Sequence, residues 1–422
     1  MINALTLIRS GIVFLLLLLG LKWYLAGFLP PSIGHILFLI GIASIVILLG
    51  PRLNQNKLGY RYGELILLAV IWFVAILRGI EPESQQFDIN AVTGRLVTLG
   101  LILALAFIIT TQSSVSRTIN NITSSFILGM IFYLGLNLAG AIFGLQNNYV
   151  ESLFFISDDS IFRQRVTFPF ASHHREVGFI SGLLGVMCLS LIQNKDMKLV
   201  NIYVFGLILS IIVLALAGVR SPFIAIFISI FLTNITLKSK KQYILFSIVM
   251  MSFILCYLLF DFNAAIFTRN GDIEEIWSLN GRVLIWQSIW NDILVNPGMY
   301  IFGYGAFGHV KSELVYSYAW MWPIPERITS HNLYLQILID MGFVGLYIFL
   351  KVSTRAIQML KVKLKNANAR AVKAGFIYIL VLGLFDVILY YNTYLFLIFM
   401  ATVICLSKRL ALSKMGQRLV YE

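Results

Sequence analysis

Charged residues are scarce in this sequence, and that scarcity restricts its fold more than any other feature. They make up 12% of the 422 residues, whereas an ordinary soluble domain has about 25%. Hydrophobic residues make up 59%, the mean hydropathy is +0.86, and apolar residues gather in runs of about 20, the length of a helix that crosses a bilayer. The composition excludes a soluble globular protein. It predicts an all-α polytopic membrane protein with a single transmembrane domain over residues 1–422.

Cysteine is almost absent, and so is any recognisable metal motif. All three cysteines lie inside apolar runs, where a thiol behaves as a small hydrophobic group. His173, His174 and Glu176 stand close together, but their spacing matches no zinc motif. We therefore expect neither disulfides nor a metal site. Internal repeats are also lacking, which argues against an inverted-repeat transporter.

Twelve apolar runs are long enough to be membrane-spanning helices. The predicted spans are 11–29, 33–50, 62–80, 91–111, 122–144, 177–193, 199–217, 222–237, 242–262, 331–350, 371–389 and 391–407. The first run continues to Pro30 without a small-residue cleavage site, so we expect a retained helix and not a signal peptide. An even number of spans places both termini on the same side of the membrane.

Basic residues are distributed unevenly between the two sides of these spans. With the amino terminus inside, 21 of the 32 Lys and Arg residues fall in cytoplasmic segments, together with only three acidic residues. This positive-inside distribution explains the net charge of +13 without nucleic acid, and it predicts that both termini are cytoplasmic. Nine of the other 11 basic residues are Arg, which suits bidentate contacts to phosphate, although snorkelling at the interface explains them as well.

Two long connections, 145–176 and 263–330, both fall on the outer side, where chemistry is most expected. The second contains apolar residues at three- and four-residue spacing between Asn280 and Pro297. They are Val283, Trp286, Ile289, Trp290 and Ile293. The pattern predicts an amphipathic helix that lies on the outer membrane surface, with its Trp face toward lipid or the bundle.

Three ionisable side chains stand at predicted outer helix starts: Arg220, Arg282 and His331. Helix amino termini favour anions, so these residues together predict a site for a lipid pyrophosphate and a general base. Asp386 lies near the outer end of the eleventh predicted span and needs a partner such as Arg220 or His331. Asp340 faces the opposite side of the helix that His331 opens. Taken singly, each cation is also explained as an interfacial anchor or, for His331, a capped histidine.

These residues resemble the integral-membrane O-antigen ligases and O-antigen polymerases of bacterial polysaccharide assembly. The shared signature is His331-Asn332, nine residues, Gly342, two residues, and Gly345. The Arg after Ala217-Gly-Val, the Gly281-Arg282 opening of the loop helix and the late Asp386 also agree. The resemblance covers about residues 210–390. Val219 departs from the pattern, because the family usually has Ser or Thr before the arginine.

The resemblance implies a GT-C-like fold in the bacterial inner membrane, with a periplasmic active site. The implied reaction is a metal-independent, inverting transfer of a glycan from undecaprenyl pyrophosphate to a sugar hydroxyl, with no cofactor. His331 would be the general base, Arg220 and Arg282 would hold the pyrophosphate, and Asp386 would orient or support one of them.

Polymerase and ligase share this signature. Arg163, Arg165 and Arg175 in the 145–176 connection favour a polymerase, because a second cationic segment suits a second pyrophosphate-linked substrate; a solvated covering loop is the alternative. A ligase would instead use a lipid A-core acceptor, and a chain-length regulator is a further candidate partner. A lipid-linked oligosaccharide flippase or another transporter, and a structural partner in a synthesis complex, remain the competing interpretations.

Overall fold

The computed structural model describes most of the chain, and every regular element in the described part is a helix. The described residues are 4–49, 63–81, 85–111, 115–145, 166, 168–192, 200–219, 221–234, 282–318, 328–361, 366–389 and 394–418. The helices are α1 (Ala4–Leu25), α2 (Pro31–Leu49), α3 (Gly63–Leu77), α4 (Ile89–Thr111), α5 (Val115–Ile142), α7 (His174–Ile192), α8 (Val200–Ala217), α9 (Ser221–Asn234), α13 (Arg282–Val295), α14 (Gly308–Lys311), α15 (Val315–Tyr318), α16 (Leu333–Lys361), α17 (Ala367–Leu382) and α18 (Tyr394–Arg418).

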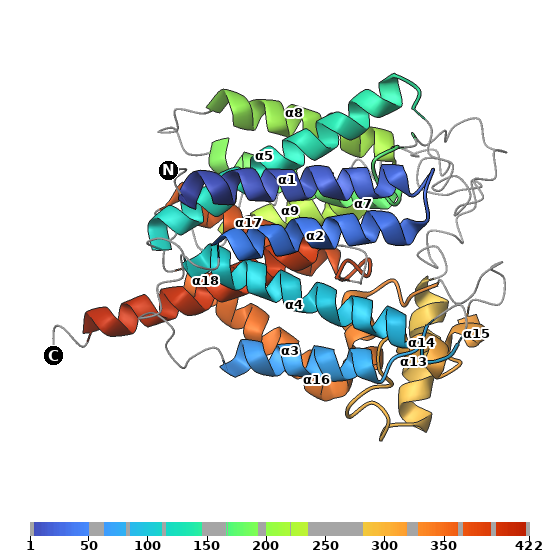
Figure 1. Cartoon of the computed structure of the whole chain (residues 1–422). Helices are drawn as coiled ribbons and strands as arrows, with labels where there is room; N and C mark the ends of the chain where they lie inside the picture. Colours follow the sequence, from blue (N-terminus) through green and yellow to red (C-terminus); the bar gives the residue numbers. More distant parts are fainter. Residues whose placement is uncertain are drawn as a thin grey trace, which may run out of the picture.

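The long helices run roughly alongside one another, and α13 runs across their direction at one end (Figure 1). The start of α1 and the end of α18 lie at the opposite end of the bundle. Eleven of the twelve predicted spans coincide with a described helix, and span 242–262 lies outside the described residues. Four helical stretches, in α4, α5, α7 and α16, are long and apolar enough to cross a membrane, which supports an integral membrane protein.

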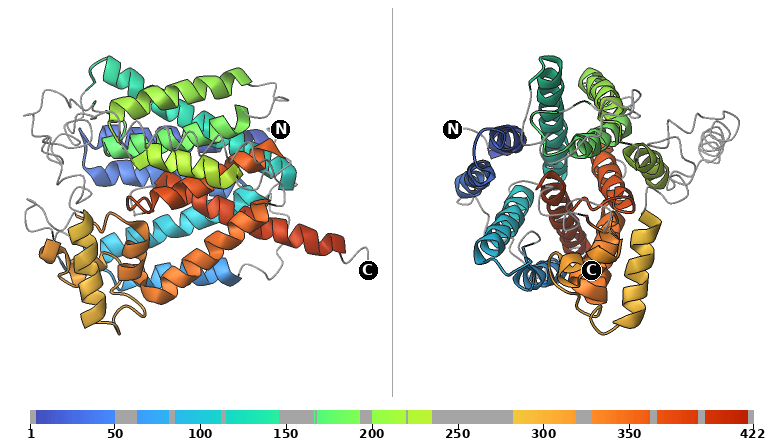
Figure 2. Two further views of the ribbon diagram at one scale, coloured as in Figure 1. Left: turned by 180° about the vertical axis from the view of Figure 1, so that it is seen from behind. Right: turned by 90° about the vertical axis from the view of Figure 1, so that its right-hand side faces the viewer.

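Burial divides the bundle into inner and outer helices. Viewed along the bundle, α17 and α18 lie inside the other helices (Figure 2, right). Both α7 and α17 bury nearly every side chain between their ends. Large exposed apolar side chains gather on the outer helices, for example Ile36 and Ile47 of α2, Ile66 of α3, and Phe205 and Ile211 of α8. Exposed apolar surface of this extent suits contact with lipid, which further supports an integral membrane protein.

Two of the differences from the predicted boundaries concern site residues. The predicted span 371–389 is too long, because α17 ends at Leu382 with Gly383 as its C-cap, and Asp386 lies in the turn that follows. The predicted loop 145–176 also ends early, because α7 begins at His174. Arg175 is therefore a residue of the first helical turn and not of a loop.

The helix α16 is broken at Gly342, whereas the sequence predicted an uninterrupted span. Gly342 has φ +70° and ψ −173°, and residues 300–305 pack against the break. Backbone groups on both sides of the break are paired with this segment: Tyr304 N to Ile339 O (2.8 Å), Gly305 N to Asp340 O (3.0 Å), Phe343 N to Tyr300 O (2.7 Å) and Val344 N to Ile301 O (3.3 Å). A membrane helix can be interrupted where another part of the protein satisfies its freed backbone groups, as segment 300–305 does here.

We predict that Gly342→Ala lowers the thermal unfolding midpoint of the purified protein in detergent. The new Cβ would lie 2.3 Å from Ile301 O, and the positive φ alone costs about 1–3 kcal/mol for a residue with a side chain. The matched control is Gly100→Ala in α4, where an added Cβ meets nothing within 4 Å. Equal midpoints for the two variants would show that the break does not depend on glycine.

Candidate functional site

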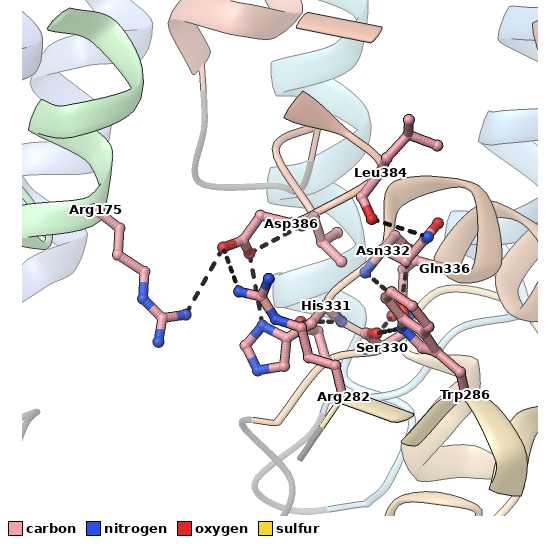
Figure 3. Close-up of polar contacts among 11 residues, drawn as sticks. Arg175, Arg282, Trp286, Ser330, His331, Asn332, Gln336, Leu384 and Asp386 are labelled. Atoms are coloured by element: carbon pink, nitrogen blue, oxygen red, sulfur yellow. Dashed lines mark hydrogen bonds and ion pairs between the residues drawn. The ribbon is translucent and has the colours of Figure 1, made fainter. Parts of the chain in front are cut away.

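The carboxylate of Asp386 is the centre of a charged cluster at the end of the bundle where α13 lies (Figure 3). Its Oδ2 lies 3.9 Å from Arg175 Nη1 and 3.9 Å from Arg282 Nη2, and its Oδ1 lies 3.7 Å from His331 Nδ1. Four different segments supply these side chains: the first turns of α7 and α13, the turn before α16 and the turn after α17. The cluster therefore exists only when these segments fold against one another.

Two hydrogen bonds join the start of α16 to the turn after α17. Leu333 N donates to Gly383 O (2.7 Å), and the Asn332 Nδ2 amide donates to Leu384 O (3.1 Å). Asn332 is also the cap of α16, since its Oδ1 accepts from the N–H groups of the next two helical positions, 334 and 335. The same residue thus begins the helix and attaches it to the segment that carries Asp386.

His331 occupies a backbone conformation that a non-glycine residue rarely adopts. Its φ is +50°, in the left-handed region. The residues on both sides are fixed: Ser330 Oγ donates to Asn332 O (2.8 Å), and the indole Nε1 of Trp286 in α13 donates to Ser330 O (3.1 Å). This strained turn directs the imidazole toward Asp386 (Figure 3).

Arg175 is positioned by the start of α7. Its backbone N–H donates to the ring Nδ1 of His173 (2.9 Å), and Glu176 accepts hydrogen bonds from Ser172. The Arg175 side chain is 36% exposed, compared with 11% for Asp386. The Arg175 side chain is thus more exposed than the carboxylate that it contacts, so an anionic ligand can approach the cluster from the side of Arg175.

Burial and charge act in opposite directions on Asp386. Burial raises the pKa of the carboxyl, but the hydrogen-bonding and charge interactions with His331 and the charges of Arg175 and Arg282 lower it more, so the pKa lies well below its usual range. Asp386 is therefore ionised at neutral pH. Both arginine pairs are longer than a direct N–H···O hydrogen bond, so an anion that accepts shorter bonds can compete for the guanidinium groups.

The imidazole of His331 is neutral at neutral pH. Burial lowers its pKa below the ordinary 6.5, and Arg175 and Arg282 lower it further, while Asp386 partly opposes them. A neutral imidazole can accept a proton. Nδ1 faces Asp386 across 3.7 Å, which is longer than a direct hydrogen bond, and Nε2 is the ring nitrogen on the side away from the carboxylate. The cluster thus combines a proton acceptor with two cations.

The structure brings together three of the site residues predicted from sequence: Arg282, His331 and Asp386. Arg175 was predicted to serve a second substrate, yet it contacts the same carboxylate and belongs to this cluster. Arg220, Arg163 and Arg165 lie outside the described residues. Asp340 lies apart from the cluster: its Oδ1 accepts from Gly308 N (3.0 Å) and Gln336 Nε2 (3.0 Å).

Most of the apolar stripe predicted for α13 is turned inward. Ile289 and Ile293 of the stripe are buried together with Ile285, Val283 and Trp286 are half-buried, and Trp290 is 61% exposed. Sequence reasoning placed Trp286 in an apolar stripe and missed its hydrogen bond to the turn before His331. The sequence could have indicated this hydrogen bond, because the indole N–H of a partly buried tryptophan usually finds an acceptor. Gln336 was missed as well, although it is a lone amide in an apolar run.

Comparison with known families places part of this site in a recognised domain. Residues 205–350 match the family model described as O-antigen ligase. No curated protein matches the chain. The matched region contains Arg220, Arg282 and His331, while Arg175 and Asp386 lie outside it. The structure therefore extends the cluster beyond the matched region in both directions along the chain.

We predict that Asp386→Asn lowers the pKa of His331 further, because Asp386 is the group that raises it. The measurement is an NMR pH titration of protein labelled at the histidine ring, with the His331 signal assigned from its loss in His331→Gln. Glu81→Gln, which removes a carboxylate paired with Arg95, is the matched control and should leave this pKa unchanged. A higher His331 pKa in Asp386→Asn would contradict the arrangement.

Proposed function

We propose that this chain, whose residues 205–350 match the O-antigen ligase family, is an inverting glycosyltransferase of the bacterial inner membrane. It transfers a glycan from undecaprenyl pyrophosphate to a sugar hydroxyl, without a metal ion or cofactor. Both termini are cytoplasmic and the charged cluster is periplasmic, as the positive-inside distribution predicts. The observation that carries the proposal is the position of His331 and of two arginines around the same carboxylate, that of Asp386.

In the proposed reaction His331 is the general base. Its Nε2 removes the proton from the acceptor hydroxyl while that oxygen attacks the anomeric carbon of the donor sugar. The bond between the anomeric carbon and the pyrophosphate oxygen breaks, and the configuration inverts because attack comes from the opposite face. Asp386 holds the ring and stabilises the imidazolium that forms. The products are the extended glycan and undecaprenyl pyrophosphate.

The arginines are assigned to the departing pyrophosphate. Negative charge develops on the leaving oxygen as the glycosidic bond breaks, and fixed guanidinium groups stabilise it most when water is largely excluded. Arg282 is 20% exposed and Arg175 is 36% exposed, so both are partly shielded yet accessible. Arg220 keeps its predicted role in binding the same group.

We favour a repeat-unit polymerase, with a lipid A-core ligase as the second candidate. A polymerase has use for a separate cationic segment that binds a second pyrophosphate-linked substrate. Because Arg175 contacts Asp386, Arg163 and Arg165 are the residues left for that segment. The family description favours the ligase. Both candidates use the same donor and base, and they differ in the acceptor.

We predict that the purified protein extends an undecaprenyl-pyrophosphate-linked repeat unit in buffer containing EDTA, and that His331→Ala lowers the rate about 10²- to 10⁴-fold, the range for loss of a general base. Products are separated on a gel, with and without lipid A-core. A ladder from the repeat unit alone indicates a polymerase, and a shift that requires lipid A-core indicates a ligase.

The same His331→Ala protein separates the enzyme from the transporter. If neither product forms with the unmodified protein, and vesicles containing His331→Ala still translocate lipid-linked oligosaccharide, the enzyme proposal is wrong. Dependence of the rate on added Mg²⁺ or Mn²⁺ would contradict the metal-independent scheme alone.

We predict that Arg282→Lys lowers the rate by about 10²-fold, as expected when a donor to the developing charge is lost. Lysine keeps the charge but not the planar pair of donors. The control is Arg95→Lys, since Arg95 also pairs with a carboxylate, that of Glu81, away from this cluster. Full turnover by Arg282→Lys would reject its role at the pyrophosphate.

A further inference from the structure

A chain of buried polar side chains runs from the turn that carries His331 into α16 and on to the loop that contains α14. Ser330, Gln336, Asp340 and His309 are all at most 5% exposed. Each polar group buried in a membrane protein has an energetic cost, and such groups are usually retained for function. No sequence motif or family description assigns these residues a role.

Gln336 is the link in this chain, and its orientation is fixed. Its Oε1 accepts from Ser330 N (3.3 Å), and its Nε2 donates to Asp340 Oδ1 (3.0 Å) and lies 3.1 Å from His309 Nδ1. Turning the amide over would place its NH₂ group against the Ser330 N–H. Its oxygen would then face the carboxylate of Asp340. The neighbours therefore permit one orientation, in which an acceptor is directed at the residue before His331.

Asp340 fixes Gln336 and is itself fixed from two sides. Its Oδ1 accepts from Gln336 Nε2 and from Gly308 N in the outer loop, and its backbone carbonyl accepts from Gly305 N at the break of α16. The rigid part of α16 and the loop segment 300–309 therefore form one support. Among the described residues, the side chain of Gln336 connects this support to the turn that carries His331.

We infer that Gln336 and Asp340 are positioning residues that hold His331 in its left-handed conformation, with Trp286 holding the same turn from α13. The conformation is strained, so it needs support from outside the turn. Ser330 receives that support on both of its backbone groups, from Gln336 at its N–H and from Trp286 at its carbonyl. Neither residue needs to contact the substrate. This inference rests on the proposed function only for its kinetic consequence.

The expected result is selective loss of turnover. Gln336→Leu and Asp340→Leu should lower kcat about 10- to 100-fold with KM unchanged, because a displaced base slows the chemical step while the arginines still bind the donor. Asp340→Asn should retain activity, because its amide oxygen still accepts from Gln336 and Gly308.

The control is Ser353→Ala, a small buried substitution in the same helix. Trp286→Phe keeps an aromatic ring at this position and removes the indole donor, so it tests the turn if Gln336→Leu does not fold.

Hydrogen–deuterium exchange provides a measurement that does not depend on activity. In Gln336→Leu, Asp340→Leu and Trp286→Phe, the peptide containing Ser330 to Asn332 should exchange faster, while peptides of α7 and α17 exchange as before. Unchanged exchange at this peptide would overturn the inference, and so would equal impairment of Asp340→Asn and Asp340→Leu. If the unmodified protein transfers no glycan but exchange changes as described, the proposed function fails and the positioning role stands.

Discussion

The pairing of two helix ends is the interaction on which the site depends. Inside a membrane protein the backbone groups at a helix terminus have little water available, so they must find partners in the protein. The turn before α16 and the turn after α17 satisfy each other through Leu333 N to Gly383 O and Asn332 Nδ2 to Leu384 O. Because these turns carry His331 and Asp386, the same bonds that complete the two helices bring the imidazole and the carboxylate together.

The net charge of the assembled cluster influences both the protonation of His331 and the binding of an anion. One carboxylate stands among two guanidinium groups and an imidazole, so the cluster is cationic when His331 is neutral. Burial lowers the pKa of His331, the positive charge of the two arginines lowers it further, and the same positive charge favours an anion. A bound anion usually raises the pKa of a nearby histidine and so makes it a poorer proton acceptor. Here the charges of the two arginines lower the pKa of His331, and Asp386 partly opposes them.

The region around α13 has a supporting role that extends well beyond the charged residues. Segment 300–305 fills the break in α16, α14 contributes the N–H of Gly308 to Asp340, and Trp286 reaches the turn from α13 itself. These contacts make the loop region part of the framework of the site. They also explain why a helix with an exposed Trp290 can lie across the bundle and still be fixed, since its isoleucine face is buried.

The sequence by itself determined the helical membrane architecture and indicated His331 as a site residue, because hydropathy and the His331 to Gly345 signature are local properties of the chain. It also indicated Arg282 and Asp386, since ionisable residues next to apolar runs are conspicuous. Only the tertiary structure decided that Arg175 belongs to the same cluster, that α17 ends before Asp386, and that α16 is broken at Gly342. Each of these depends on a contact between segments far apart in the chain. Gly383 O, for example, pairs with Leu333 N, 50 positions earlier, and no local pattern encodes such a partner.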